Sequence, residues 1–155
     1  MTSSNEYLIT LIGAGRLATQ LAKALQGAGH RIASIYSRTC HSAHKLHRQL
    51  ENNGQIVVTD HLADLPQSDV YIIAVTDTAL AEVLSAWPLQ TRDKVVLHTA
   101  GSLSMDMLKS VSNHYGVLYP MQTFSKEIPV DFKDVFIFTE SNGPTSQKVV
   151  SDIAL

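Results

Sequence analysis

The sequence of 155 residues contains a single cysteine, Cys40, and this scarcity limits the classes of protein it can encode. One cysteine cannot build an intramolecular disulfide framework, so a reducing compartment is expected. The first residues show no basic segment followed by a long apolar stretch, and no secretory signal is predicted. We therefore expect a cytoplasmic location.

Long hydrophobic runs and clusters of positive charge are also missing. The longest apolar runs, such as VYIIAV at 70–75, have the length of a strand and are far too short to span a bilayer. The formal net charge is −2, and no stripe of lysine and arginine offers the field that binds a phosphate backbone. We expect neither a membrane nor a nucleic acid among the partners.

Short β-rich segments alternate with helical segments, which is typical of α/β domains. Apolar strands separated by helices indicate a parallel sheet covered on both sides. The sequence predicts one doubly wound, mainly parallel α/β domain of the Rossmann type over residues 1–155. The expected strands are 7–15, 31–37, 55–60, 70–75, 94–100, 117–120 and 134–140, and the expected helices are 16–29, 42–54, 78–87, 102–116 and 144–155.

A glycine-rich segment, LIGAGRLATQLAKAL, follows the first predicted strand and opens the first predicted helix. Its G-x-G-x-x-A pattern would give a tight turn at Gly13, a close backbone approach to a pyrophosphate at Gly15 and close helix packing at Ala18. The helix N-terminus offers free N–H groups to phosphates. This context favours dinucleotide binding over a structural turn. Arg16 is either a pyrophosphate contact or a solvated arginine. The predicted contacts are Gly13, Ala14, Gly15, Arg16 and Leu17.

The segment that follows lacks any carboxylate from Ser34 to Leu50. An enzyme that uses NAD normally places Asp or Glu about 20 residues past the glycine loop, where it binds the ribose hydroxyls. Ser37, Arg38 and Thr39 stand there instead, and their side chains can bind a 2′-phosphate that a carboxylate would repel. The sequence predicts NADP as the cofactor, unless Arg38 simply points to water.

Three histidines, His41, His44 and His47, follow at spacings of three. They span a broad arc of a helix, which favours a solvated face over a metal site, and we expect no metal. A contact of His41 with the adenosine phosphate is the remaining alternative. Cys40 is interpreted as a packing residue.

Five segments in order, IGAGRLA, YSR, SDVYIIAVTDTALAEVL, VVLHTAGSLSMDML and YGVLYPMQTFSKE, resemble a bacterial family of candidate NADP oxidoreductases. That family joins a Rossmann-like N-terminal domain to an uncharacterised helical C-terminal domain, within the superfamily of pyrroline-5-carboxylate reductase and 6-phosphogluconate dehydrogenase. The sequence departs from the family at Ala100, commonly serine, and at Tyr119, commonly histidine.

The resemblance implies that the end of the fourth strand passes under the nicotinamide ribose, at Ala74, Val75 and Thr76. The end of the fifth strand would border the nicotinamide. His98 lies in it as either a cofactor or substrate contact or a hydrogen-bonded core histidine, and Ser102 could cap a helix near Leu103. The loop MQTFSKE is the other candidate for the substrate side.

The function predicted from these features is NADP-dependent hydride transfer between the nicotinamide and a small carbonyl or imine substrate. The alternative is a non-catalytic NADP(H)-binding or redox-sensing module, since no catalytic residue is identified. The acid-free YSRT argues against a methyltransferase. The final segment, PTSQKVVSDIAL, looks like a helix only just begun, so we expect a truncated chain whose helical domain after 155 forms a homodimer.

Overall fold

A computed structural model describes residues 5–51, 55–121, 128 and 131–154. Short 3₁₀ turns lie at Leu62–Asp64, Met105–Ser110 and Phe132–Asp134. The strands are β1 (Leu8–Ile12), β2 (Arg31–Tyr36), β3 (Val57–Thr59), β4 (Val70–Ile73), β5 (Val95–His98), β6 (His114–Pro120) and β7 (Ile137–Ser141). The α-helices are α1 (Arg16–Gly27), α2 (Cys40–His47), α3 (Asp77–Ser85) and α4 (Pro144–Ala154).

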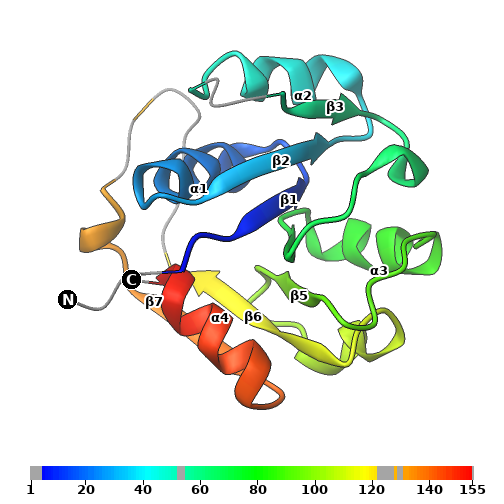
Figure 1. The fold of residues 1–155 in the computed structure, drawn as a ribbon, viewed down its shortest axis with the longest axis vertical. Coiled ribbons are helices and arrows are strands. Elements are labelled where there is room, and N and C mark those ends of the chain that lie inside the picture. The colour runs from blue at the N-terminus through cyan, green and yellow to red at the C-terminus, as the bar shows by residue number, and fades with distance from the viewer. Residues whose placement is uncertain (1–4, 52–54, 122–127, 129–130, 155) are drawn as a thin grey trace.

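The strands form one sheet in the order β3-β2-β1-β4-β5-β6-β7. All neighbouring pairs from β3 to β6 are parallel, and β7 joins β6 in the antiparallel sense. The predicted mainly parallel, doubly wound sheet is confirmed. The strand order reverses between β1 and β4, with β2 and β3 on one side of β1 and β5 and β6 on the other (Figure 1). Such a switch point opens a crevice at the carboxyl ends of the strands.

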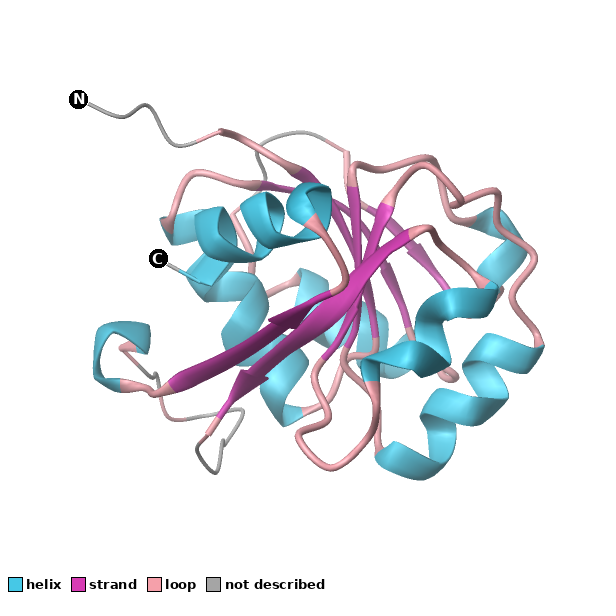
Figure 2. Cartoon of the chain, turned by 90° about the horizontal axis from the view of Figure 1, so that it is seen from below, coloured by secondary structure: helices cyan, strands magenta, loops and turns pink. Residues whose placement is uncertain are grey.

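Helices cover both faces of the sheet (Figure 2), and each face has its own apolar core. On one face α1, α2 and α4 pack on the strands through residues such as Leu25, Leu46 and Val150. On the other face the core includes Leu80 of α3 and Leu108 of the turn at Met105–Ser110. Burial of the strands from both sides explains their unbroken apolar sequences.

The predicted helix at 102–116 is wrong. The structure has a 3₁₀ turn at Met105–Ser110, and β6 already begins at His114. Residues 114–116 pair in parallel with residues 95–97 of β5, so sheet formation overrides the local helical pattern. On the other side of β6, Gly116 permits the close approach of β7, because a Cβ there would lie 2.2 Å from the carbonyl oxygen of Glu140.

The last predicted strand is shifted rather than absent. It was expected at 134–140, but the 3₁₀ turn at Phe132–Asp134 occupies its start and β7 runs from Ile137 to Ser141. The carboxylate of Asp131 accepts a hydrogen bond from the Lys133 N–H at 2.9 Å, which fixes this turn. The expected helix near the end of the chain is present as α4.

Candidate functional site

A cavity of about 470 Å³ lies at the crevice beside the carboxyl ends of β1, β2 and β4. Parallel α/β sheets bind nucleotides at this place. Three segments that are distant in sequence therefore converge on one site. The predicted residues that line the cavity are Gly13, Ala14, Gly15, Arg16, Leu17, Ser37, Arg38, Ala74, Val75 and Thr76.

The two glycines of the loop have different structural roles. Gly13 has a φ of +120°, and a Cβ there would lie 2.2 Å from the carbonyl oxygen of Ala74. Its N–H donates a hydrogen bond of 2.7 Å to the carbonyl of Tyr36, which ties the loop to the end of β2. Gly15 precedes the first residue of α1, and a Cβ there would meet no atom within 4 Å. The loop therefore leaves open space in front of the helix N-terminus.

The end of β2 supplies the polar rim at the adenosine side of the predicted site. Ser37 and the exposed Arg38 both line the cavity. Thr39 is not among the lining residues; it precedes α2, and its hydroxyl donates a hydrogen bond of 3.0 Å to Ser42. The polar groups expected to bind a phosphate are thus present on this rim, with the exception of Thr39.

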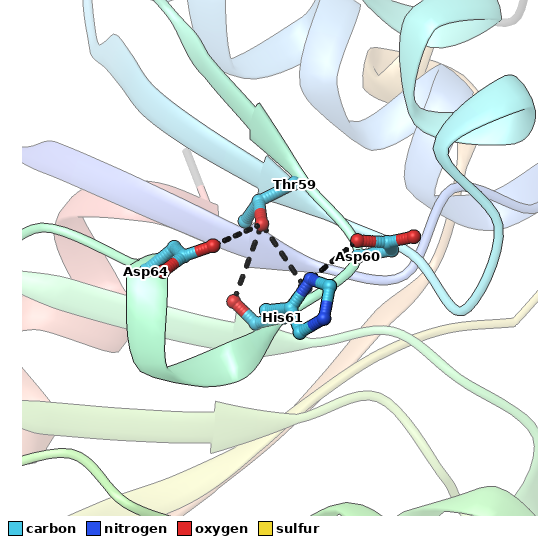
Figure 3. A network of polar contacts seen from close by, with 4 residues as sticks. All are labelled: Thr59, Asp60, His61 and Asp64. Atoms are coloured by element: carbon cyan, nitrogen blue, oxygen red, sulfur yellow. Dashed lines mark hydrogen bonds and ion pairs between the residues drawn. The ribbon is translucent and has the colours of Figure 1, made fainter.

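A polar network at the end of β3 supports this rim (Figure 3). The Thr59 carbonyl accepts a hydrogen bond from the Ser37 N–H at 3.2 Å, which links the network to the rim. The Thr59 hydroxyl accepts a hydrogen bond from the His61 N–H at 3.0 Å. The same hydroxyl is 3.2 Å from a carboxylate oxygen of Asp64, and the His61 ring lies 2.6 Å from Asp60. These contacts hold the turn that brings Leu62 to the cavity wall.

The ends of β4 and β5 form the side where the nicotinamide was expected. Thr76 lines the cavity, and its hydroxyl accepts a hydrogen bond of 3.3 Å from the Ala79 N–H, which caps α3. Thr99, which follows β5, also lines the cavity. The Thr76 hydroxyl therefore caps α3, and the same residue lines the cavity.

His98 lies outside the cavity and is completely buried. Its Nδ1 accepts a hydrogen bond of 3.0 Å from the Ala100 N–H, and its Nε2 is 3.1 Å from the Ser104 carbonyl oxygen. These two partners define a neutral ring with the proton on Nε2. Burial lowers the pKa of His98, which also favours the neutral form. Both ring nitrogens of His98 therefore have partners inside the core, and a contact of His98 with the cofactor stays a prediction.

Ser102 does not cap the turn that follows β5. Ser104 has that role, because its hydroxyl accepts a hydrogen bond of 3.1 Å from the Asp106 N–H. Ser102 instead donates a hydrogen bond of 3.0 Å to Asp77 in the first turn of α3. This bond connects the loop after β5 to the first turn of α3, next to Thr76, which lines the cavity.

The two positions at which the sequence departs from the family that it resembles lie beside His98 and Gly101. The Ala100 N–H holds the His98 ring, as described above. The Tyr119 ring lies over Gly101, where a Cβ would come within 2.4 Å of it, and stacks beside Phe138 with ring centres 6.5 Å apart. Tyr119 therefore ties the loop after β5 to the β6–β7 pair.

The histidines of α2 stay apart from the cavity. His41 and His44 are exposed, and His47 is half-buried. Within the described ranges, no group of three His, Cys, Asp or Glu side chains could hold a metal ion. Partial burial and the nearby Asp60 carboxylate raise the pKa of the Cys40 thiol, so this thiol is protonated at neutral pH.

Sequence reasoning missed the wall that α3 contributes. A spacing of three to four residues places Ala79, Glu82, Val83 and Ala86 on one helix face. That spacing was visible in the sequence, but which face meets the crevice depends on tertiary packing. The other missed lining residues are Tyr36, Leu62 and Thr99.

A larger hollow of about 980 Å³ lies between α1, α4 and the β6–β7 pair. Its lining is largely apolar and includes Leu21, Leu118, Ile137 and Ile153, but none of the predicted cofactor residues. The size of a cavity alone therefore does not identify the cofactor site.

The loop MQTFSKE, which was predicted on the substrate side, is described only at Met121, whose side chain is exposed. Residues 122–127 lie outside the described residues. No described helix has the length and apolar character needed to cross a membrane.

A doubly wound sheet with a glycine-lined crevice defines the class of nucleotide-binding α/β domains. The chain matches the Rossmann-like domain family over residues 3–121 and belongs to it. It is 41% identical to a candidate NADP oxidoreductase from Bacteroides fragilis, with a TM-score of 0.88 to that solved structure. The resemblance expected from the sequence is confirmed. No curated protein matches the chain.

More distant solved structures share the fold. Prephenate dehydrogenase from A. aeolicus, solved with NAD+, is 16% identical with a TM-score of 0.73, over 99% of this chain and 58% of that one. Pyrroline carboxylate reductase from Plasmodium falciparum, solved with NADP, is 16% identical with a TM-score of 0.67, over 98% and 55%. The alignment with the Bacteroides fragilis protein covers 98% of this chain and 58% of that chain.

Proposed function

We propose that this domain binds NADP(H) and serves an oxidoreductase that transfers a hydride between the nicotinamide and a small carbonyl or imine substrate. The observation that carries the proposal is the position of Ser37 and Arg38. Both line the same cavity as the glycine-rich loop, at the end of β2. The Bacteroides fragilis relative, a candidate NADP oxidoreductase, supports the same cofactor.

The cavity fits a phosphorylated dinucleotide in its donor groups. Open space beside Gly15 lets a pyrophosphate approach the backbone, and the N-terminus of α1 provides N–H donors and a positive dipole end. Arg38 can bind a 2′-phosphate through charge-assisted hydrogen bonds. The bound cofactor supplies the hydride chemistry, while these residues bind and orient it.

The substrate site is proposed to need more than this domain. The chain spans 58% of the Bacteroides fragilis protein. We propose a helical domain after residue 155 that completes the site and forms a homodimer. If the full protein oxidises NADPH with none of a panel of small carbonyl and imine compounds but binds it tightly, the redox-sensing alternative is favoured.

Isothermal calorimetry with NADPH and NADH tests the cofactor. We expect tighter binding of NADPH, and we expect Arg38→Ala to cost about 1.5–3 kcal/mol of NADPH binding while NADH binding stays nearly unchanged. Arg48→Ala is the matched control, because Arg48 is an exposed arginine just after α2 and outside the cavity. Equal losses for both cofactors, or tighter binding of NADH, would contradict the proposal.

A further inference from the structure

The wall of the cavity formed by α3 differs in character from the wall formed by the glycine-rich loop. Ala79, Val83 and Ala86 present small apolar side chains from one helix face, and Leu62 adds a further apolar surface. A wall of this kind suits the flat, apolar face of an aromatic ring. The phosphate-binding donors all lie elsewhere, on the loop before α1 and at the end of β2.

Glu82 lies on the same face of α3 and is the only carboxylate among the described residues that line the cavity. Its carboxylate has no hydrogen bond or ion pair with any residue in the described part of the chain. An ionised carboxylate accepts hydrogen bonds and donates none. The exposed carboxylate of Glu82 also repels phosphate groups, which favours a hydrogen-bond donor over an anion as the part of a ligand that faces it.

We propose that Glu82 selects the adenine ring of the cofactor by accepting a hydrogen bond from its exocyclic amine. The inference rests on the proposed NADP(H) binding and names the group that recognises the base. The 2′-phosphate lies at Ser37 and Arg38, and the base extends from there to the apolar face of α3. Hypoxanthine carries a carbonyl oxygen in place of the amine and a proton on the neighbouring ring atom N1, so a carboxylate placed to accept from the amine would face the carbonyl oxygen as a second acceptor.

Nicotinamide hypoxanthine dinucleotide phosphate, in its reduced form, differs from NADPH in this way and is the probe. Calorimetric titrations compare the wild type with Glu82→Gln and with Glu140→Gln. We expect the wild type to prefer NADPH by about tenfold or more, the scale of one hydrogen bond to a charged group. Glu82→Gln should reduce the preference to within about threefold, because an amide can also donate to a carbonyl oxygen. Glu140→Gln should keep the wild-type ratio, since Glu140 is exposed on β7 and does not line the cavity.

The outcomes separate this inference from the proposed function. NADPH binding with no preference over the hypoxanthine cofactor, or an equal preference in Glu82→Gln and the wild type, overturns the role of Glu82 alone. The Glu82→Gln protein could also bind NADPH less tightly relative to NADH while it keeps the wild-type preference for adenine over hypoxanthine. That result would show that Glu82 acts on Arg38 rather than on the base, and it would overturn the proposed role of Glu82. Failure of the wild type to bind NADPH overturns the proposed function and this inference together.

Discussion

Alanine substitutions at Gly13 and Gly15 should have opposite consequences for stability and for binding. At Gly13 the positive φ costs a residue with a Cβ about 1–2 kcal/mol. The new Cβ would also overlap the carbonyl oxygen of Ala74, at 2.2 Å, and relieving such overpacking costs about 1–3 kcal/mol. We therefore expect Gly13→Ala to lower the free energy of unfolding by roughly 2–5 kcal/mol.

At Gly15 the backbone has a φ of −81°, which any residue adopts, and the Cβ position is open. The poorer helix cap of alanine and the reduced entropy of its unfolded chain nearly cancel, so stability should stay within about 1 kcal/mol of the wild type. The Cβ would instead fill the space in front of α1. We expect NADPH affinity to fall by about tenfold or more, the scale of one lost charge-assisted hydrogen bond.

Urea denaturation and NADPH titration of both variants provide the test, with Gly143→Ala as the control. Gly143 also precedes a helix and has an open Cβ position, but it lies outside the cavity, so neither property should change there. A Gly13→Ala protein with the wild-type urea midpoint would refute the contact with Ala74. A Gly15→Ala protein with undiminished NADPH affinity would refute the placement of the pyrophosphate at this loop.

The parts of the site that could be predicted from the sequence are those encoded by short, contiguous segments. The loop from Gly13 to Leu17 joins a strand directly to a helix, so its role in a crevice follows from local order. Ser37 and Arg38 could be placed by counting to the end of the next parallel strand. Both segments line the cavity because adjacent parallel strands end at the same edge of the sheet.

The parts that could not be predicted depend on contacts between distant segments. Whether His98 faces the cofactor or the core is decided by Ser104, which lies beyond the strand and provides a carbonyl acceptor. The wall containing Glu82 requires knowledge of which face of α3 meets the crevice. The prediction of a helix at 102–116 was wrong for the same reason, since the pairing of residues 114–116 with β5 outweighed the local helical periodicity of the sequence.

Two further predictions concern buried histidines. His98→Ala should destabilise the fold by about 2–4 kcal/mol, because the Ala100 N–H and the Ser104 carbonyl lose their partner and a cavity remains. The NADPH affinity of this variant should change less than about threefold, and a tenfold loss in a folded variant would show that His98 contacts the cofactor. The second prediction concerns pH, because burial lowers the pKa of His30 as well as that of His98. The Nδ1 of His30 accepts a hydrogen bond from the Tyr7 N–H at 3.2 Å. Below about pH 6.5 the unfolded chain therefore binds protons that the folded chain does not. Stability is fully present above that pH and should fall on acidification towards the folded pKa values, by at most about 1.4 kcal/mol per pH unit for each histidine. Urea midpoints measured between about pH 7.5 and 5 test this sign, and a midpoint that rises on acidification would show that these rings are protonated in the folded protein.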